Sequence, residues 1–215
     1  KTIKEFNIPG AVNHDWEDIG LGGGPVDGVN YLYIADIGNN NYPQRDISII
    51  YRIPEIQDIN SSFDGSKLNT IRFKYPDGVR DAETIWVDPV SKDIFVVSKE
   101  AQSSVYRIPY PQSTTDVIVA EKTGVIKAFG MATGGSISPD GTEILIRNYV
   151  NTFYWKKGKN ETIAQALNRD ANKQLTIVLE QQGEGVGFDR DAKGFYTIGE
   201  RRIDANVNLN YYKKK

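Results

Sequence analysis

A short acidic motif recurs along this chain of 215 residues, and it limits the folds that the chain can adopt more than any other feature. Its glutamates are Glu17, Glu83 and Glu184, and a degraded copy has Gly135 in the same place. Each copy is followed by a turn and then by further apolar runs. Self-similarity at a long period is typical of repeat architectures, so we expect similar structural units arranged in series.

Each repeat contains apolar segments rich in β-branched and aromatic residues, separated by Gly, Pro, Asn and Asp turns. We predict strands at 16–21, 31–35, 49–53 and 70–75; at 83–87, 94–97, 105–109 and 117–120; at 136–138, 143–146, 152–155 and 175–179; and at 185–188, 195–198 and 207–212. A short helix is expected within 161–167. This order predicts one all-β domain over residues 1–215, a β-propeller of four-stranded antiparallel blades. An open β-sandwich with similar hairpins is the alternative.

The last repeat lacks a fourth strand, whereas residues 2–8 have the alternating pattern of one. We therefore expect residues 2–8 to pair with 207–212, giving four blades in which the N-terminal strand closes the last and no sheet edge is left exposed. The alternative is a five-bladed propeller that lacks part of its first blade, or a ring completed by another chain.

Composition narrows the classes of function. The formal net charge of −2 provides no basic surface for nucleic acid or anionic lipid. No apolar run approaches the ~20 residues that a membrane span needs. The chain has no cysteine, which excludes disulfides and thiolate sites, and His14 as the single histidine argues against a His-rich zinc site. We expect His14 to be a loop residue rather than a catalyst.

Two features bear on the compartment. Residues 1–9 alternate like a strand and do not resemble a cleavable leader, so we expect a mature or trimmed form. Asn60 and Asn160 begin N-glycosylation patterns, which favours a secreted, extracellular or periplasmic protein.

The innermost strands of a propeller line its central channel, so equivalent residues of the repeats should form a ring there. The candidate metal ligands are Glu17, Asp36, Glu83 and Glu184. The residues expected to line the channel are Asn39, Lys99, Glu100, Arg147, Asn148 and Glu200. Carboxylate and amide oxygens are ligands that suit Ca²⁺, the one cofactor that we predict. Three interpretations of these residues remain: a salt-bridged channel that only fixes blade packing, a calcium site, and a catalytic metal centre.

Several motifs also resemble a family of largely uncharacterised secreted bacterial β-propellers. They are Asp15–Ile19, Tyr31–Asn40, Asp81–Glu83, Ser98–Glu100, Ile146–Tyr149 and Glu184–Asp189. The resemblance covers nearly the whole chain and implies distant kinship with phytase-like and lactonase-like propellers, some of which use calcium in the channel. This chain has Asn39 where members of the family carry Asp, and it lacks their further N-terminal blade.

We therefore predict a binding or structural module with an acidic channel that holds Ca²⁺ and takes an unknown small ligand or protein. The alternatives are a metal-dependent hydrolase of phosphate esters or lactones, and a subunit of an extracellular assembly that associates with itself or is completed by another chain. No nucleophile–base pair is recognisable, and the sequence leaves open whether the protein is an enzyme.

Overall fold

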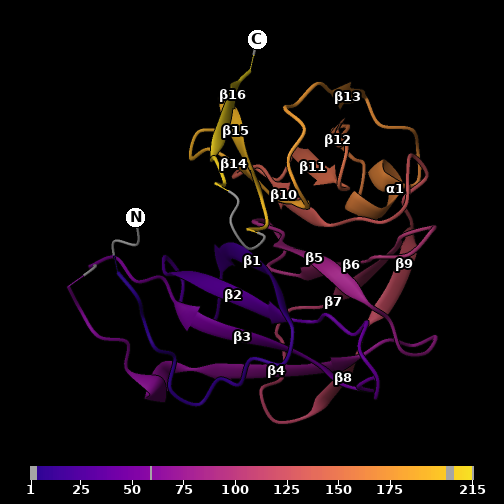
Figure 1. The fold of residues 1–215 in the computed structure, drawn as a ribbon. Coiled ribbons are helices and arrows are strands. Elements are labelled where there is room, and N and C mark those ends of the chain that lie inside the picture. Colours follow the sequence, from indigo (N-terminus) through magenta and orange to yellow (C-terminus); the bar gives the residue numbers. More distant parts are fainter. Residues whose placement is uncertain (1–3, 59, 202–205, 215) are drawn as a thin grey trace.

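The computed structural model describes residues 4–58, 60–201 and 206–214, and these form four small β-sheets arranged as the blades of a propeller (Figure 1). Blade 1 contains β1 (Trp16–Gly23), β2 (Asn30–Asp36), β3 (Ser48–Pro54) and β4 (Asn69–Lys74). Blade 2 contains β5 (Ala82–Val87), β6 (Ile94–Ser98), β7 (Ser104–Ile108) and β9 (Glu121–Val125). Blade 3 contains β10 (Gly134–Ile137), β11 (Glu143–Arg147), β12 (Thr152–Lys156) and β13 (Lys173–Leu175). Blade 4 contains β14 (Gly183–Phe188), β15 (Gly194–Gly199) and β16 (Asn210–Lys213). The predicted all-β propeller is confirmed.

Helix is confined to two short pieces of the described chain, a 3₁₀ turn at Gly65–Lys67 (η1) and α1 (Ile163–Leu167). Thr162 and Gln165 form a capping box at the start of α1, and the helix packs its apolar side chains against β9 of blade 2 and β12 of blade 3. The predicted helix at 161–167 is therefore correct. No helix in the described residues is long and apolar enough to cross a membrane.

The fourth strand of blade 2 differs from the prediction. The apolar run predicted at 117–120 forms β8 (Val117–Val119), which pairs in parallel with β4 of blade 1. The outer strand of blade 2 is instead β9, a more polar segment that pairs with β7. Residues 117–119 thus form a strand as their local β-propensity predicts, but long-range contacts pair this strand with the neighbouring blade.

The apolar cores lie between the blades. One cluster joins blades 1 and 2 and includes Tyr33, Phe73 and Ile85, and a second joins blades 2 and 3 around Trp86 and Trp155. Packing between the innermost strands follows the ring, from β1 to β5, from β5 to β10 and from β10 to β14. Among the described residues, no comparable packing joins β14 to β1.

The expected closure by residues 2–8 is not seen. Residues 4–8 form no strand, residues 2 and 3 lie outside the described residues, and the sheet of blade 4 has three described strands. Ile8 and Ala11 instead pack on the face of blade 1 that points away from blade 2, beside Ile34 and Tyr51. The N-terminal segment therefore packs on this apolar face and does not add a strand to blade 4. The predicted closure of blade 4 by this segment is wrong for the described residues.

Candidate functional site

The three glutamates of the repeated motif occupy the same structural position in three blades. The register between the two innermost strands shifts between Trp16 and Asp18, between Ala82 and Thr84, and between Gly183 and Gly185. Glu17, Glu83 and Glu184 are therefore the extra residues of three β-bulges. A bulge turns a side chain away from its ordinary alternation, which explains why a glutamate here need not enter the core between blades.

Blade 3 departs from this arrangement, and its glycines explain why. The pairing of β10 with β11 is regular, without a bulge. A Cβ atom on Gly134 would lie 1.9 Å from the carbonyl oxygen of Glu184. β14 can therefore approach β10 closely only because glycine replaces a larger residue in the degraded motif. The ring of acidic residues has a gap at Gly135.

Electrostatic coupling shows that the bulge glutamates lie near one another. Burial raises the pKa of Glu17 to about 8, and nearby carboxylates add to this effect. Those carboxylates belong to Glu83, Asp15, Asp81 and Glu184. Burial also raises the pKa of Glu184, with Glu200 contributing. The site therefore concentrates negative charge that needs protons or cations for compensation.

Lys99 is the cation that the chain itself supplies to this site. It follows β6, and its ammonium group is bonded to Oε1 of Glu83 and lies 5.1 Å from the ring centre of Tyr149. Burial raises the pKa of Glu83 to about 7, although Lys99 acts in the opposite direction. For Lys99, burial alone would lower the pKa, but the Glu83 carboxylate outweighs it and holds the pKa above its ordinary value. Oε2 of Glu83 is buried without a hydrogen-bond partner in the described structure.

A residue just after the second strand makes an equivalent backbone hydrogen bond to the motif segment in blades 1, 2 and 4. The amides of Lys99 and Glu200 donate to the carbonyls of Asp81 and Gln182, over 2.9 and 2.8 Å. The equivalent donor in blade 1 is Gly38, which bonds to the carbonyl of Asp15 over 3.2 Å. A Cβ atom on Gly38 would lie 2.1 Å from Oε1 of Glu17, so a larger residue here would displace that carboxylate.

Arg147 supports the site from inside the fold rather than from the channel surface. Its side chain is fully buried, and Nη1 lies 2.6 Å from Oε2 of Glu180 and 3.0 Å from the carbonyl oxygen of Gly185. Glu180 also accepts hydrogen bonds from Thr197 and Asn210, over 2.5 and 2.7 Å. This network ties β11 to β14 and so fixes the strand that carries Glu184.

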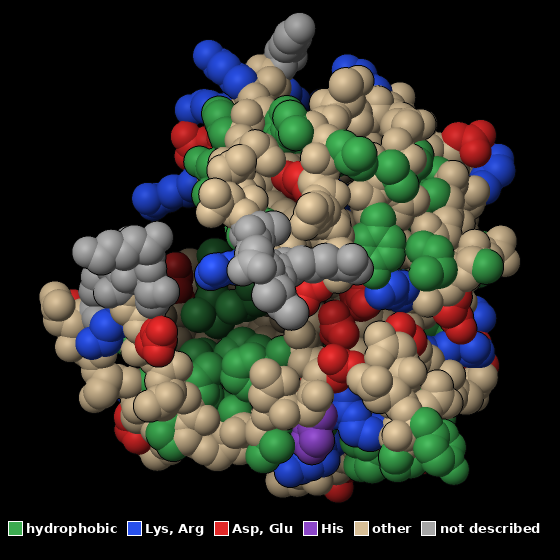
Figure 2. Space-filling model, in the orientation of Figure 1, with side chains coloured by type: hydrophobic (Ala, Val, Ile, Leu, Met, Phe, Trp, Pro, Cys, Tyr) green, Lys and Arg blue, Asp and Glu red, His purple; other side chains and the backbone are tan. Residues whose placement is uncertain are grey.

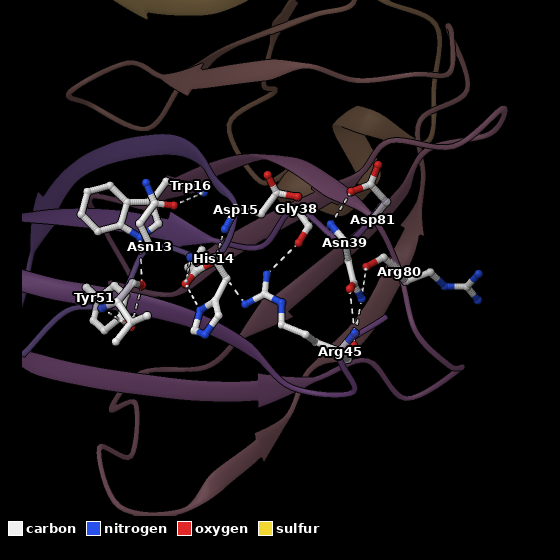
Figure 3. A network of polar contacts seen from close by, with 12 residues as sticks. Asn13, His14, Asp15, Trp16, Gly38, Asn39, Arg45, Tyr51, Arg80 and Asp81 are labelled. Carbon is white, nitrogen blue, oxygen red and sulfur yellow. Dashed lines mark hydrogen bonds and ion pairs between the residues drawn. The ribbon is translucent and has the colours of Figure 1, made fainter. Parts of the chain in front are cut away.

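Asp36 belongs to a separate polar network with His14, Asp15 and Arg45, three residues that Figure 3 labels. Its buried carboxylate accepts hydrogen bonds from the amides of His14 and Asp15, over 3.3 and 2.9 Å. Nδ1 of His14 lies 2.8 Å from Oδ2, and Nη1 of Arg45 lies 3.1 Å from Oδ1. Asp36 thus anchors the segment that precedes Glu17, and the structure does not bring it together with the three glutamates. His14 lies in a bend, as expected, although its ring has a partner.

The other residues expected to line the channel mostly shape loops. The amide group of Asn39 exchanges hydrogen bonds with the backbone of Arg45, and its own backbone N–H donates to Asp81 over 2.7 Å. Glu100 pairs with Arg80 over 2.9 Å. Oδ1 of Asn148 accepts the amides of residues 150 and 151.

Sequence reasoning missed three members of the site, namely Asp15, Asp81 and Glu180. Asp15 and Asp81 were visible as the first residue of two copies of the motif, whereas the sequence offered no signal for Glu180. In the described residues, no three Asp, Glu or His side chains converge closely enough to hold a metal ion by direct contact.

Comparisons with known proteins support the fold. No known protein family matches the sequence, and no curated protein matches it. Among solved structures, the chain is similar to the periplasmic gluconolactonase of Pseudomonas aeruginosa, with a TM-score of 0.50 and 13% sequence identity over 91% of this chain and 56% of that one. It is also similar to hydrazine synthase of Kuenenia stuttgartiensis, with a TM-score of 0.48 and 15% identity over 96% of this chain and 49% of that one. The chain thus spans about half the length of these proteins.

Proposed function

We propose that the protein is a binding module whose acidic channel holds a cation through the bulge glutamates, with Ca²⁺ as the physiological ion. The position of Glu17, Glu83 and Glu184 on equivalent bulges of three blades carries this proposal, because it gathers buried carboxylates that Lys99 alone does not compensate. Burial is the main cause of their raised pKa values, and neighbouring carboxylates add to it. The unpartnered Oε2 of Glu83 is a free acceptor within the cluster.

Since no three acidic side chains of the described residues converge on one point, the ion would be bound partly through water. Ca²⁺ accepts six to eight oxygen ligands in flexible geometry, and water commonly supplies some of them. Weak sites of this kind occur in extracellular modules, with dissociation constants of about 10⁻⁴–10⁻³ M. The proposal therefore includes a secreted or periplasmic location, where such a site would be filled.

Thermal unfolding with and without Ca²⁺ tests the proposal. For a dissociation constant of about 1 mM, 10 mM Ca²⁺ should stabilise the folded protein by about 1.4 kcal/mol. For a chain of this size, that corresponds to a rise in Tm of about 3–6 °C. The rise should disappear in Glu17→Gln/Glu184→Gln and persist in Glu121→Gln, since Glu121 lies on the exposed strand β9 and pairs with Arg107. An equal rise in Tm in the unmodified protein and both variants would show that Ca²⁺ does not act through the channel glutamates.

Metal-dependent hydrolysis of phosphate esters or lactones is the competing function. The observation in its favour is Glu83, whose pKa of about 7 suits a general base at neutral pH. A screen with both substrate classes, in the presence and absence of EDTA, separates the two functions. Turnover that requires metal and is lost in Glu83→Gln, with the fold retained, would overturn the binding-module proposal.

We also infer a role in self-association from the side of the ring between β14 and β1. Ile19 and Leu21 on β1 are 58% and 52% exposed, and the residues that alternate with them, Gly20 and Gly22, are the ones that face blade 2. Tyr196, Ile198 and Tyr211 are exposed on blade 4. Figure 2 shows hydrophobic side chains lining a hollow in this region. Light scattering should detect a dimer that Leu21→Ser abolishes, and a monomer at high concentration would contradict this role.

A further inference from the structure

A cavity that shares no lining residue with the channel glutamates lies between blades 3 and 4. Its volume is about 440 Å³, within the range of small-molecule sites. Aromatic rings from four strands form much of its wall, contributed by Tyr154, Phe188, Phe195 and Tyr212. Phe195 and Tyr212 are stacked with their ring centres 4.9 Å apart.

A buried carboxylate gives this apolar cavity a polar end. Glu143 begins β11, and only 9% of its side chain is exposed. Burial and the Glu143 carboxylate raise the pKa of Tyr154 to about 12, so the phenol beside it stays neutral. A carboxylate held in such surroundings needs a cationic partner, because unpaired buried charge is costly.

The chain itself supplies that partner from a lysine outside the sheet. Nζ of Lys214 lies 2.5 and 2.7 Å from the two carboxylate oxygens of Glu143. Lys214 follows β16, where its backbone amide is bonded to the carbonyl of Lys193 over 2.8 Å. Its side chain is 47% exposed, so it can leave the carboxylate without disturbing a packed core.

We propose that this cavity binds a primary alkylammonium group on an apolar stem, and that Lys214 occupies the cationic position when no ligand is present. The ammonium group would be bonded to Glu143, while the stem lies along the aromatic rings, whose faces attract cations. Lys173 and Lys213 also line the cavity, but both are exposed, so water and salt screen their charge. A neutral alcohol could donate one hydrogen bond to Glu143 but would leave its charge unpaired, and an anionic ligand would be repelled by it.

Calorimetric titration with matched probes tests this site independently of the channel. The probes are n-pentylammonium, 1-pentanol as its neutral counterpart, and Nα-acetyl-lysine N-methylamide to distinguish a free amine from a lysine side chain. We expect both amines to bind and 1-pentanol not to bind. Lys214→Ala should tighten amine binding by about tenfold, because it removes a tethered competitor at millimolar or higher effective concentration. Lys193→Ala is the control, since the ammonium of Lys193 is paired with Asp191 in solvent.

Glu143→Gln completes the test, since it keeps the shape of the cavity and removes its charge. Amine binding should be lost in this variant, with Tm measured to verify the fold. Equal binding of 1-pentanol and n-pentylammonium would overturn the proposal, and so would an unchanged affinity in Lys214→Ala. The second result depends only on an exposed side chain, so it stays decisive even if Glu143→Gln does not fold.

Discussion

Replacing Glu17 by glutamine should stabilise the metal-free protein at alkaline pH and change its stability little near pH 5. The pKa of Glu17 is raised from 4.5 to about 8, chiefly by burial and by the neighbouring carboxylates. The folded state therefore binds a proton that the unfolded state has already released between these two values. Stability then falls as the pH rises from about 4.5 to about 8, and it stays low above that. Glutamine resembles the protonated side chain and carries no such dependence.

The magnitude follows from the shift. A difference of about 3.5 pKa units corresponds to about 4.8 kcal/mol at 1.36 kcal/mol per unit. Glu17 keeps partial contact with solvent, so we reduce this to about 2 kcal/mol at pH 9. Glu17→Gln should then melt about 4–8 °C above the unmodified protein at pH 9.

Thermal unfolding in EGTA at pH 5, 7 and 9 provides the measurement, because chelation keeps adventitious cations from stabilising the carboxylates. Glu121→Gln is the matched control and should lose a little stability at every pH, as expected for an exposed ion pair. A difference between Glu17→Gln and the unmodified protein that does not change with pH would refute the electrostatic account of the channel. So would a variant that is less stable at pH 9.

Two further substitutions test how the fold presents this site. Gly134→Ala should destabilise the protein by about 1–3 kcal/mol in urea unfolding, because the new methyl group would meet the carbonyl oxygen of Glu184. Gly187→Ala is the control and should be close to neutral, since nothing lies within 4 Å of the added atom. Arg147→Met should cost about 3–5 kcal/mol by leaving Glu180 without its cation. Arg107→Met, which breaks an exposed pair with Glu121, should cost less than about 1 kcal/mol, and equal losses in the two arginine variants would contradict the buried-network account.

The repeat pattern predicted the blades because the middle strands are strongly apolar over a short distance. The strands at β2, β3, β6, β7, β11 and β15 lie within a residue or two of their predicted positions. Outer strands were harder to predict. Residues 175–179 were expected as a strand, but β13 occupies Lys173–Leu175, because a half-exposed outer strand carries little apolar signal.

The sequence predicted the charged residues of the site but not how they are arranged in space. The glutamates could be found because they repeat, yet nothing in the local sequence distinguishes a bulge from regular pairing. Asp36 is the last residue of an apolar strand, and Lys99 directly follows one. Only the three-dimensional fold shows that Asp36 binds backbone amides whereas Lys99 pairs with Glu83. The partner of Arg147 lies 33 residues away, beyond any local pattern.

Neighbouring residues of the repeated motif have different roles: one joins adjacent blades and the other carries the charge of the channel. The fold can therefore tolerate a blade that lacks the channel carboxylate. In blades 1 and 3, the residue after the motif position bonds to the next blade. Oδ2 of Asp18 accepts the amide of Ile85 over 2.8 Å, and Oγ of Ser136 accepts the amide of Phe188 over 3.2 Å. The glutamate itself stands on the bulge and makes no such bond between blades at Glu17. Because cohesion of the ring and charge of the channel depend on adjacent but different positions, the charge can change while the blades stay joined. Blade 3 is an example, since it keeps Ser136 for cohesion and has Gly135 in place of the carboxylate.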